Sequence, residues 1–458
     1  MPRQTLSPLL AAQRVFFASG KSKALEFRME SLRSLQGALQ RREKALFDAL
    51  RADLGKSEAE SYLTEVGFVL KEVRHTLKHL PRWVRPRRVP TPLVLQPGRQ
   101  RLYHEPLGAT LIIAPWNYPV SLSLSPLVGA VAAGNTAILK PSELASASSQ
   151  AIAEVVREAF SPEHVAVLEG GKEVSEALLA EKWDHIFFTG GTGIGRIVAR
   201  AGAEQLAKVT LELGGKSPAI VTAKARLDVA ARRIAWGKFT NAGQTCVAPD
   251  YLLVEKGVYG PFLDALKVAI REMYGDDPAA SPDYGRIVNA AHFERLCRLI
   301  TPENVVVGAE HDAERCYIAP TVLRDVSPSH PAMQDEIFGP VLPVLKVEDL
   351  DEAIATIGNH PNPLALYVFS EDRAEQQRVI AQVPFGGGCV NNTIVHLADP
   401  GLPFGGRNES GLGAYHGEHS FETFSHRKAV HEAATWLDLA LKYPPYAGRL
   451  GLLRKLIR

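Results

Sequence analysis

The sequence predicts an α/β protein built around a doubly wound, mostly parallel β-sheet. From about residue 108 onward, short apolar runs alternate with helix-like segments at intervals of 20 to 30 residues, a pattern typical of strands joined by helical crossovers. Polar and glycine-rich residues follow these runs, at the carboxyl ends of strands where parallel sheets bind ligands. With 458 residues, 46% of them hydrophobic, the chain is long enough for two or three domains, each with its own core.

The predicted elements begin with helices, since residues 9–80 carry apolar positions at helical spacing and few breakers beyond Gly55. The strands of the first sheet follow as the runs ATLIIAPW, NTAILKP, HVAVLE, HIFFTG and KVTLELGG. A second α/β pattern starts near Ser217 and continues to about residue 418, which predicts a separate domain. Beyond it, FETFSHRKAVHEA predicts a strand that can add to a sheet edge.

Composition and charge narrow the class of protein. The chain has 52 Lys and Arg against 50 Asp and Glu, so no overall charge attracts it to nucleic acid. Four cysteines are too few for a disulfide framework and are typical of a reducing compartment. The closest histidines, His416 and His419, lack companions at ligand spacing, so we expect no metal site. No signal peptide or run of ~18 apolar residues is found, and we expect a cytoplasmic protein.

Three residues are candidates for a chemical role, and each has a structural alternative. Cys246 lies in NAGQTCVAPDY, although a lone cysteine is usually a small core residue. Glu212 ends a strand directly before two glycines, where a buried carboxylate could activate water; a solvated edge residue is the alternative. Asn117, in APWNYP, is either a turn residue or an amide donor to a developing oxyanion.

A glycine-rich turn follows the strand DHIFF and includes Gly190, Gly191 and Gly195. Such a turn lets a phosphate approach backbone N–H groups at the positive end of a helix. The usual dinucleotide fingerprint is incomplete here, because Arg196 stands where the last glycine is required. The turn alone is therefore a weak signal.

Taken together, these segments resemble the aldehyde dehydrogenase superfamily, and most of all its class-3 or fatty-aldehyde branch. Further matching segments are GNTAILKPSE, DEIFGPVLPV, LPFGGRNESGLGAYHG and SFETFSHRK. They occur in family order and cover roughly residues 10–435. The resemblance implies an aldehyde dehydrogenase fold with a Rossmann-like cofactor domain, an α/β catalytic domain and a small oligomerisation arm.

The resemblance also implies roles for individual residues. Cys246 would be the nucleophile, Asn117 and the Cys246 backbone N–H would hold the oxyanion, and Glu212 would activate water against the thioester. The residues expected to bind NAD or NADP are Trp116, Lys140, Glu143, Gly190, Gly191, Gly195, Leu213, Glu336 and Phe338. The expected walls of a substrate tunnel are Tyr62, Tyr118, Thr245 and Ile394. Many relatives carry a serine at the position of Gly191, so the preference between NAD and NADP stays open.

The resemblance further implies a domain organisation and a homodimer. The expected parts are an NAD(P)-binding domain (1–81 and 102–212), a catalytic domain (213–418), an oligomerisation arm (82–101 and 419–440) and a basic amphipathic C-terminal tail (441–458). We expect the tail to pack on the body or partner or to cover the substrate entrance, with weak peripheral membrane contact as the alternative.

The predicted function is the NAD(P)-dependent oxidation of medium- or long-chain aliphatic or aromatic aldehydes to carboxylic acids. A coenzyme A acylating relative is one alternative, but Glu212 as a base for water disfavours it. A cofactor-independent cysteine hydrolase would need a histidine beside Cys246, which the sequence does not identify. A non-catalytic binding or structural protein on the same fold is the remaining alternative.

Overall fold

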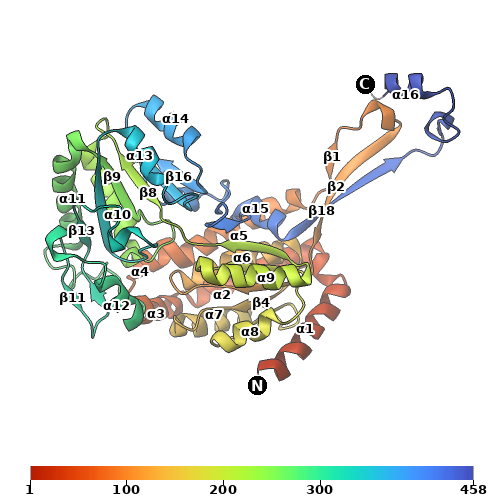
Figure 1. The fold of residues 1–458 in the computed structure, drawn as a ribbon. Helices are drawn as coiled ribbons and strands as arrows, with labels where there is room; N and C mark the ends of the chain where they lie inside the picture. Colours follow the sequence, from red (N-terminus) through yellow and green to blue (C-terminus); the bar gives the residue numbers. More distant parts are fainter. Residues whose placement is uncertain (1, 457–458) are drawn as a thin grey trace.

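The computed structural model describes residues 2–456 and contains two large sheets and a projecting arm (Figure 1). The six-stranded sheet has the order β17-β7-β6-β3-β4-β5. Its strands are β3 (Ala109–Ile113), β4 (Thr136–Lys140), β5 (Val165–Val167), β6 (His185–Thr189), β7 (Lys208–Glu212) and β17 (Gly411–Leu412). All pairs are parallel except β17 with β7. The five predicted runs are thus confirmed as β3 to β7, and near-continuous apolar character suits strands buried on both faces.

Helices cover this sheet and form the predicted helical lead-in. The lead-in contains α1 (Pro2–Ala18), α2 (Leu25–Arg41), α3 (Glu43–Leu54), α4 (Glu58–Ser61) and α5 (Gly67–Trp83). The crossover helices are α6 (Pro119–Ala133), α7 (Ser146–Ala159), α8 (Lys172–Leu179) and α9 (Thr192–Gln205). Helix α3 ends at Gly55, whose φ of 66° is the left-handed conformation that glycine adopts at a helix C-terminus. A π-helical turn over Tyr62–Val66 precedes α5.

The second α/β pattern forms a seven-stranded sheet with the order β10-β13-β14-β9-β8-β15-β16. Its strands are β8 (Pro218–Val221), β9 (Tyr251–Glu255), β10 (Val305–Val307), β13 (Thr321–Leu323), β14 (Val341–Val347), β15 (Ala365–Phe369) and β16 (Gly387–Val390). The helices of this part are α10 (Leu227–Phe239), α11 (Tyr259–Tyr274), α12 (Ala290–Cys297), α13 (Leu350–Ile357) and α14 (Arg373–Gln382). A small hairpin joins β11 (His311–Asp312) and β12 (Tyr317–Ile318).

The arm is a three-stranded sheet that projects away from the two large sheets (Figure 1). It consists of β1 (Arg87–Val89), β2 (Gly98–Pro106) and β18 (Ser425–Ala433). The expected boundary at residue 101 falls inside β2, because β2 pairs with β18 over its whole length, from Gly98 to Pro106. The expected start of the returning segment at residue 419 falls inside a helix, α15 (Gly417–Thr423).

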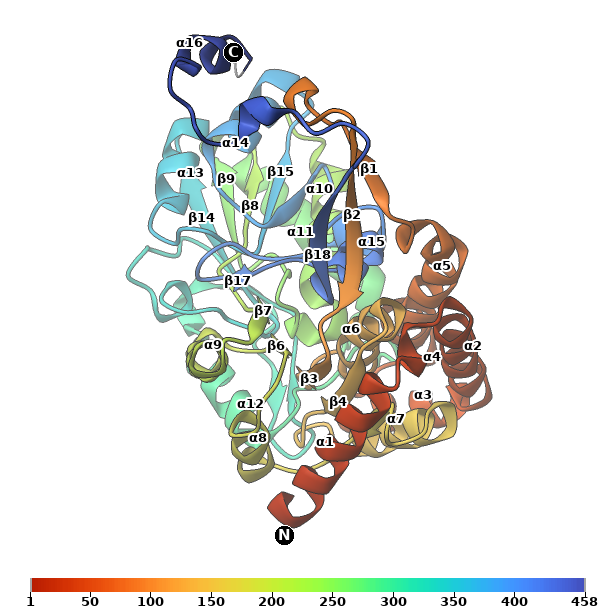
Figure 2. The same cartoon turned by 90° about the vertical axis from the view of Figure 1, so that its right-hand side faces the viewer.

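A short helix, α16 (Leu450–Leu456), forms in the predicted C-terminal tail, whose last two residues, Ile457 and Arg458, lie outside the described residues. Figure 2 shows α16 at the opposite end of the molecule from α1. Leu450 and Leu452 are exposed on α16, and Leu93, at the turn between β1 and β2, is 84% exposed. Over residues 2–456, no helix has the length and apolar character needed to span a bilayer.

Candidate active site

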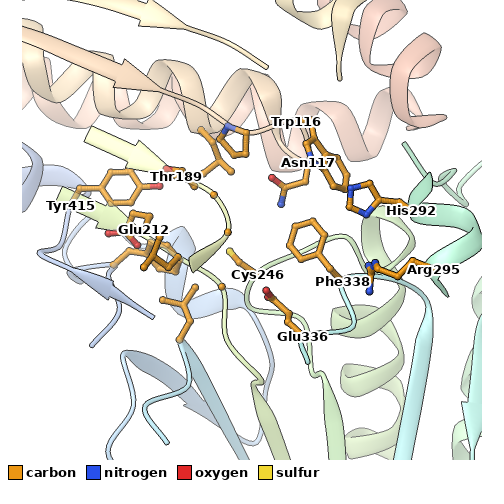
Figure 3. A pocket seen from close by; sticks show the side chains of 18 residues that line it. Trp116, Asn117, Thr189, Glu212, Cys246, His292, Arg295, Glu336, Phe338 and Tyr415 are labelled. Carbon is orange, nitrogen blue, oxygen red and sulfur yellow. The ribbon is translucent and has the colours of Figure 1, made fainter. Parts of the chain in front are cut away.

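The two large sheets meet at a cavity of about 250 Å³, called here the central cavity. Strands of the six-stranded sheet point their carboxyl ends at this cavity. The lining residues on the side of the seven-stranded sheet lie in the segments before β9, β14 and β15. Its lining residues are Pro115, Trp116, Asn117, Leu122, Thr189, Gly190, Gly191, Glu212, Leu213, Gly214, Cys246, His292, Arg295, Glu336, Phe338, Leu364, Phe404 and Tyr415. Figure 3 shows Cys246 between Asn117 and Glu336, with Glu212 on a third side. Sequence-distant candidates for chemistry therefore share one space.

The frame around Cys246 is a strained turn held by a glutamine. Asn241, Ala242 and Gly243 all have positive φ angles, of 54°, 50° and 74°. A Cβ at Gly243 would lie 2.3 Å from the carbonyl oxygen of Gly339, so only glycine fits there. The Gln244 side chain then donates to Asn241 O and accepts from Val288 N, both at 3.0 Å. The turn thus fixes the backbone immediately before Cys246.

Asn117 is fixed against the same turn. Its Nδ2 donates to the carbonyl oxygen of Gln244 at 3.0 Å, and its own carbonyl oxygen accepts from Asn241 Nδ2 at 2.7 Å. An amide nitrogen has two hydrogens, so one remains for a ligand in the central cavity. The structure therefore holds an amide donor beside Cys246 in a fixed orientation.

Glu212 is a carboxyl group of the cavity that lacks hydrogen-bond partners in the described part of the chain. Its side chain is buried, and neither carboxyl oxygen has a hydrogen-bond partner among the described residues. Burial raises the pKa of Glu212 well above its usual value, because a carboxylate loses its hydration there. Such a carboxyl group can accept and return protons near neutral pH.

The surroundings of Cys246 likewise disfavour the ionised, thiolate form of its side chain. Burial raises the pKa of Cys246, and the nearby carboxylates of Glu336 and Glu212 raise it further. Since the thiolate is the nucleophile, the protein must remove the thiol proton before attack. Glu212 faces the same cavity, and its carboxyl oxygens accept no hydrogen bond from the part of the chain that the structure describes.

Residues expected to bind the cofactor form two groups in the structure. Trp116 packs edge-to-face on Phe338, with ring centroids 5.3 Å apart, and the Phe338 φ is 48°. Glu336 Oε1 is buried with no partner among the described residues, and burial with the neighbouring Asp250 raises the pKa of Glu336 to about 8. A ribose hydroxyl is the kind of donor that such an oxygen lacks.

The second group surrounds the N-terminus of α9. Gly190 and Gly191 line the cavity there, and nothing lies within 4 Å of a Cβ built at Gly191. A Cβ at Gly195 would lie 2.5 Å from Leu213 Cδ2, so this glycine allows the helix to pack against Leu213. Lys140 and Glu143 lie outside the cavity lining and form an ion pair of 2.6 Å. The open backbone at a helix N-terminus and the unpaired Glu336 oxygen fit a dinucleotide.

The expected substrate-tunnel residues do not line the central cavity. The hydroxyl groups of Tyr118 and Thr245 lie 2.6 Å apart. In the sequence, Tyr118 directly follows Asn117, and Thr245 directly precedes Cys246. Ile394 is buried and has a positive φ of 49°. Tyr62 is 43% exposed and lies on the π-helical turn.

Sequence reasoning assigned no role to Thr189, His292, Arg295 and Tyr415, which also line the cavity. Thr189 stands directly before the glycine turn, which is a signal that could have been used. His292 and Arg295 are three residues apart on α12 and therefore share a face. Arg295 donates to Ile337 O at 2.7 Å, and His292 packs against Trp116 with centroids 5.2 Å apart. Nothing in the sequence connects α12 to this cavity.

Over the residues that the structure describes, no group of three or more His, Cys, Asp or Glu side chains could hold a metal ion. The four cysteines are all free.

Comparison with known proteins identifies the family. The profile of the aldehyde dehydrogenase family matches residues 9–430. The 4,4'-diaponeurosporen-aldehyde dehydrogenase of Staphylococcus aureus is 46% identical over 443 residues, which cover 96% of both chains. The dimeric NADP-preferring aldehyde dehydrogenase of Rattus norvegicus is 45% identical over 97% of this chain and 99% of its own. Aldehyde dehydrogenase family 3 member A2 of Macaca fascicularis is 43% identical, over 96% and 93% of the two chains.

Solved structures agree. The substrate-bound state of Staphylococcus aureus AldH is 45% identical and superposes with a TM-score of 0.97 over 99% of both chains. The NAD-dependent aldehyde dehydrogenase of Sinorhizobium meliloti is 29% identical, with a TM-score of 0.86 over 95% of this chain and 89% of its own. An indole-3-acetaldehyde dehydrogenase in complex with NAD+ is 27% identical, with a TM-score of 0.85 over 93% and 88%.

The chain belongs to the aldehyde dehydrogenase family, and its relatives include a dimeric NADP-preferring enzyme and a family 3 member. It is an oxidoreductase that converts aldehydes to carboxylic acids with NAD or NADP as the cofactor. The predicted fold class and enzyme class are confirmed. The alternatives of a coenzyme A acylating enzyme and of a non-catalytic protein gain no support.

Proposed function

We propose that this aldehyde dehydrogenase oxidises medium- or long-chain aliphatic or aromatic aldehydes, with Cys246 as nucleophile, Asn117 as oxyanion donor and Glu212 as base. One observation carries the assignment of roles. A thiol, an amide with one unused hydrogen and a buried carboxyl group without partners among the described residues face the same central cavity. Each of these groups supplies one requirement of thioester chemistry.

In the first step, Glu212 accepts the thiol proton and Cys246 Sγ forms a bond to the aldehyde carbon. The electrons of the carbonyl double bond move to its oxygen, and the Asn117 amide and the Cys246 backbone N–H donate to that oxygen. The product is a thiohemiacetal on Cys246. Bound NAD+ or NADP+ supplies the hydride acceptor that converts it to a thioester.

Before the second step, Glu212 releases the thiol proton to solvent, and it then deprotonates a water molecule that attacks the thioester carbon. The carbon–sulfur bond breaks, the carboxylic acid leaves and the Cys246 thiolate is regenerated. The raised pKa of Glu212 suits both steps, since a more basic carboxylate is a stronger proton acceptor.

Residues at the two ends of the cavity would hold the cofactor. Glu336 would accept from ribose hydroxyls, Trp116 and Phe338 would flank the ring, and the open N-terminus of α9 at Gly190 and Gly191 would face phosphate. Leu213 and Gly195 would shape that end, and Lys140 with Glu143 would reach the second ribose.

The experiment follows NADH or NADPH absorbance with purified protein, both cofactors and aldehydes from acetaldehyde to hexadecanal, together with benzaldehyde. We expect kcat/KM to rise with chain length, because Tyr62, Tyr118, Thr245 and Ile394 would wall an entrance that contacts the alkyl chain. A constant or falling kcat/KM would contradict the proposed substrate class without affecting the family.

We also infer that the protein is a cytoplasmic homodimer whose six-stranded sheet belongs to the cofactor domain and whose seven-stranded sheet belongs to the catalytic domain. Strand β18 has one edge paired with β2, and β16 is the last strand of its sheet, so each can accept a strand from a second copy. Light scattering of the full chain tests the dimer. The tail helix α16, with exposed leucines beside Arg454 and Lys455, would contact either protein, at the body, the partner or the substrate entrance, or, weakly, an anionic membrane. Sedimentation with vesicles distinguishes these two.

A further inference from the structure

Two lysine–carboxylate pairs lie buried behind the central cavity, and neither lines it. In the first pair, Lys56 Nζ lies 2.7 Å from Glu65 Oε1, and both side chains have no exposed surface. In the second, Lys216 Nζ lies 2.6 Å from Asp250 Oδ2, and each side chain is 4% exposed. Removing two charges from water costs free energy, so a fully buried ion pair is expected to serve a specific structural or functional role.

The first pair is bonded to the segment that carries Asn117. Lys56 Nζ donates to the Asn117 carbonyl oxygen at 3.0 Å and lies 3.9 Å from the centre of the Tyr118 ring. Glu65 Oε2 accepts from the backbone N–H groups of Val120 and Ser121, at 3.0 and 2.8 Å. Those N–H groups belong to the first turn of α6, where a carboxylate is favoured by the helix dipole.

The pair therefore forms hydrogen bonds to the backbone on both sides of the turn between β3 and α6. Lys56 holds the residue that presents the amide to the cavity, and Glu65 holds the start of the helix that follows. Because Asn117 O also accepts from Asn241 Nδ2, the Asn117 peptide is held by two donors from different segments. A rotation of this peptide would turn the Asn117 amide away from Cys246.

The second pair is bonded to the segment that carries Glu336. Lys216 Nζ donates to the carbonyl oxygens of Ala332 and Asp335, at 2.7 and 3.0 Å. Asp250 Oδ1 accepts from Ile337 N at 3.0 Å. The residues immediately before and after Glu336 are thus both bonded to this pair.

We propose that the two buried ion pairs are positioning groups with separate tasks: Lys56 and Glu65 position Asn117 for the chemical step, whereas Lys216 and Asp250 position Glu336 for the cofactor. The inference rests on the proposed roles of Asn117 and Glu336. A preorganised donor needs no reorganisation as charge develops, and the rigid contacts of a buried pair supply that property.

The test compares Lys56→Met with the matched variant Lys216→Met, since both remove a buried lysine and leave a side chain of similar length. For Lys56→Met we expect kcat and the rate of the NADH burst to fall about 10- to 100-fold, as displacements of about 1 Å do elsewhere. Its Kd for NAD and NADP, measured by fluorescence, should stay unchanged. For Lys216→Met we expect the reverse emphasis, with a cofactor Kd raised about tenfold, the loss typical of one hydrogen bond to a charged group.

A double-mutant cycle shows whether Lys56 acts through Asn117. In the Asn117→Ala background, Lys56→Met should change the burst rate by no more than about twofold, because the amide that it positions is gone. Lys56→Arg, which keeps the charge and donors, should recover part of the lost burst rate. A purely structural role for Lys56 would lower the burst rate equally in both backgrounds, and that result would overturn the inference.

Removing one partner strands a buried charge and threatens folding. The neutral double variant Lys56→Met/Glu65→Gln is therefore measured beside the single variants, since glutamine still accepts from the first turn of α6. If this variant melts normally and keeps the full burst rate, the inference is overturned. If Asn117→Ala itself leaves the burst rate unchanged, the proposed role of Asn117 fails instead, so the two failures are distinguishable.

Discussion

The carboxyl groups that line the central cavity differ from those packed behind it. Glu65 and Asp250 use both oxygens, each pairing with a lysine and with backbone N–H groups. Among the described residues, Glu212 has no partner on either oxygen and Glu336 has none on Oε1. An unpaired buried carboxyl group costs folding free energy, which ligands recover when they bind. Carboxyl groups with hydrogen-bond partners on both oxygens hold the shape of the site. Carboxyl groups with an unpaired oxygen are those that act on substrate, water or cofactor.

The largest expected effect comes from the cavity nucleophile. Cys246→Ala should lower kcat/KM at least about 10⁴-fold, as removal of a covalent nucleophile does in other enzymes. The thiol is not bonded to the residues that fit the cofactor, so the Kd of NAD or NADP should change no more than about twofold. Steady-state absorbance and cofactor fluorescence measure the two quantities.

A second cysteine supplies the matched control. Cys316 is free and does not line the central cavity, so Cys316→Ala should retain activity. Substantial oxidation by Cys246→Ala would remove the thiol from the mechanism, and with it the reading of Glu212 as the base that serves that thiol.

The next effect tests the unpaired carboxyl group directly. Glu212→Gln should lower steady turnover about 10²- to 10⁴-fold, because an amide cannot accept the proton of water. The first equivalent of NADH should still form when the thiol is deprotonated by raised pH. Stopped-flow absorbance then shows a burst followed by almost no turnover. An unchanged steady rate would mean that the isolation of Glu212 is incidental.

The pH dependence follows from the same isolation. Burial raises the pKa of Glu212, and burial together with Glu336 and Glu212 raises the pKa of Cys246. Both groups act in their deprotonated forms, so kcat should rise with pH, about tenfold per unit below the governing pKa. In Glu212→Gln the loss of a neighbouring negative charge lowers the pKa of Cys246, and alkylation of the thiol by iodoacetamide should begin at lower pH. A kcat that falls as pH rises through neutrality would contradict both assignments.

The strands that lead to the cavity and several of its lining residues could be predicted from the sequence. The strands β3 to β7 are short apolar runs that recur at intervals of 20 to 30 residues, and the turn residues that follow them identify the edge where ligands bind. Asn117, Glu212 and Cys246 could be singled out as candidates from their short local segments, whereas the role of each followed from the resemblance to the aldehyde dehydrogenase family. Their meeting in one cavity is confirmed only by the fold.

The groups behind the cavity were not accessible in the same way. Lys56 is separated by 61 residues from the carbonyl oxygen that it holds, and Lys216 by 119 residues from Asp335. A lysine in a helical or loop segment carries no sequence signal of burial, since lysines are mostly exposed. The same holds for His292 and Arg295, which reach the cavity from a helix with an ordinary amphipathic pattern.

The smallest expected effect concerns Gly191, where the cavity presents backbone instead of a side chain. Nothing lies within 4 Å of a Cβ at Gly191, so Gly191→Ser should fold normally and add a hydroxyl at the N-terminus of α9. One further hydrogen bond to phosphate is worth about 1 kcal/mol, and the Kd of NAD or NADP should fall about fivefold with kcat unchanged. Gly195→Ala is the opposing control, since its Cβ would lie 2.5 Å from Leu213 Cδ2 and force either the buried Leu213 side chain or α9 to move. It should weaken cofactor binding and lower the melting temperature. If Gly191→Ser leaves both Kd values unchanged, the phosphates do not approach α9 here. The backbone at Gly191 would then belong with the groups that hold the shape of the site rather than with those that bind ligands.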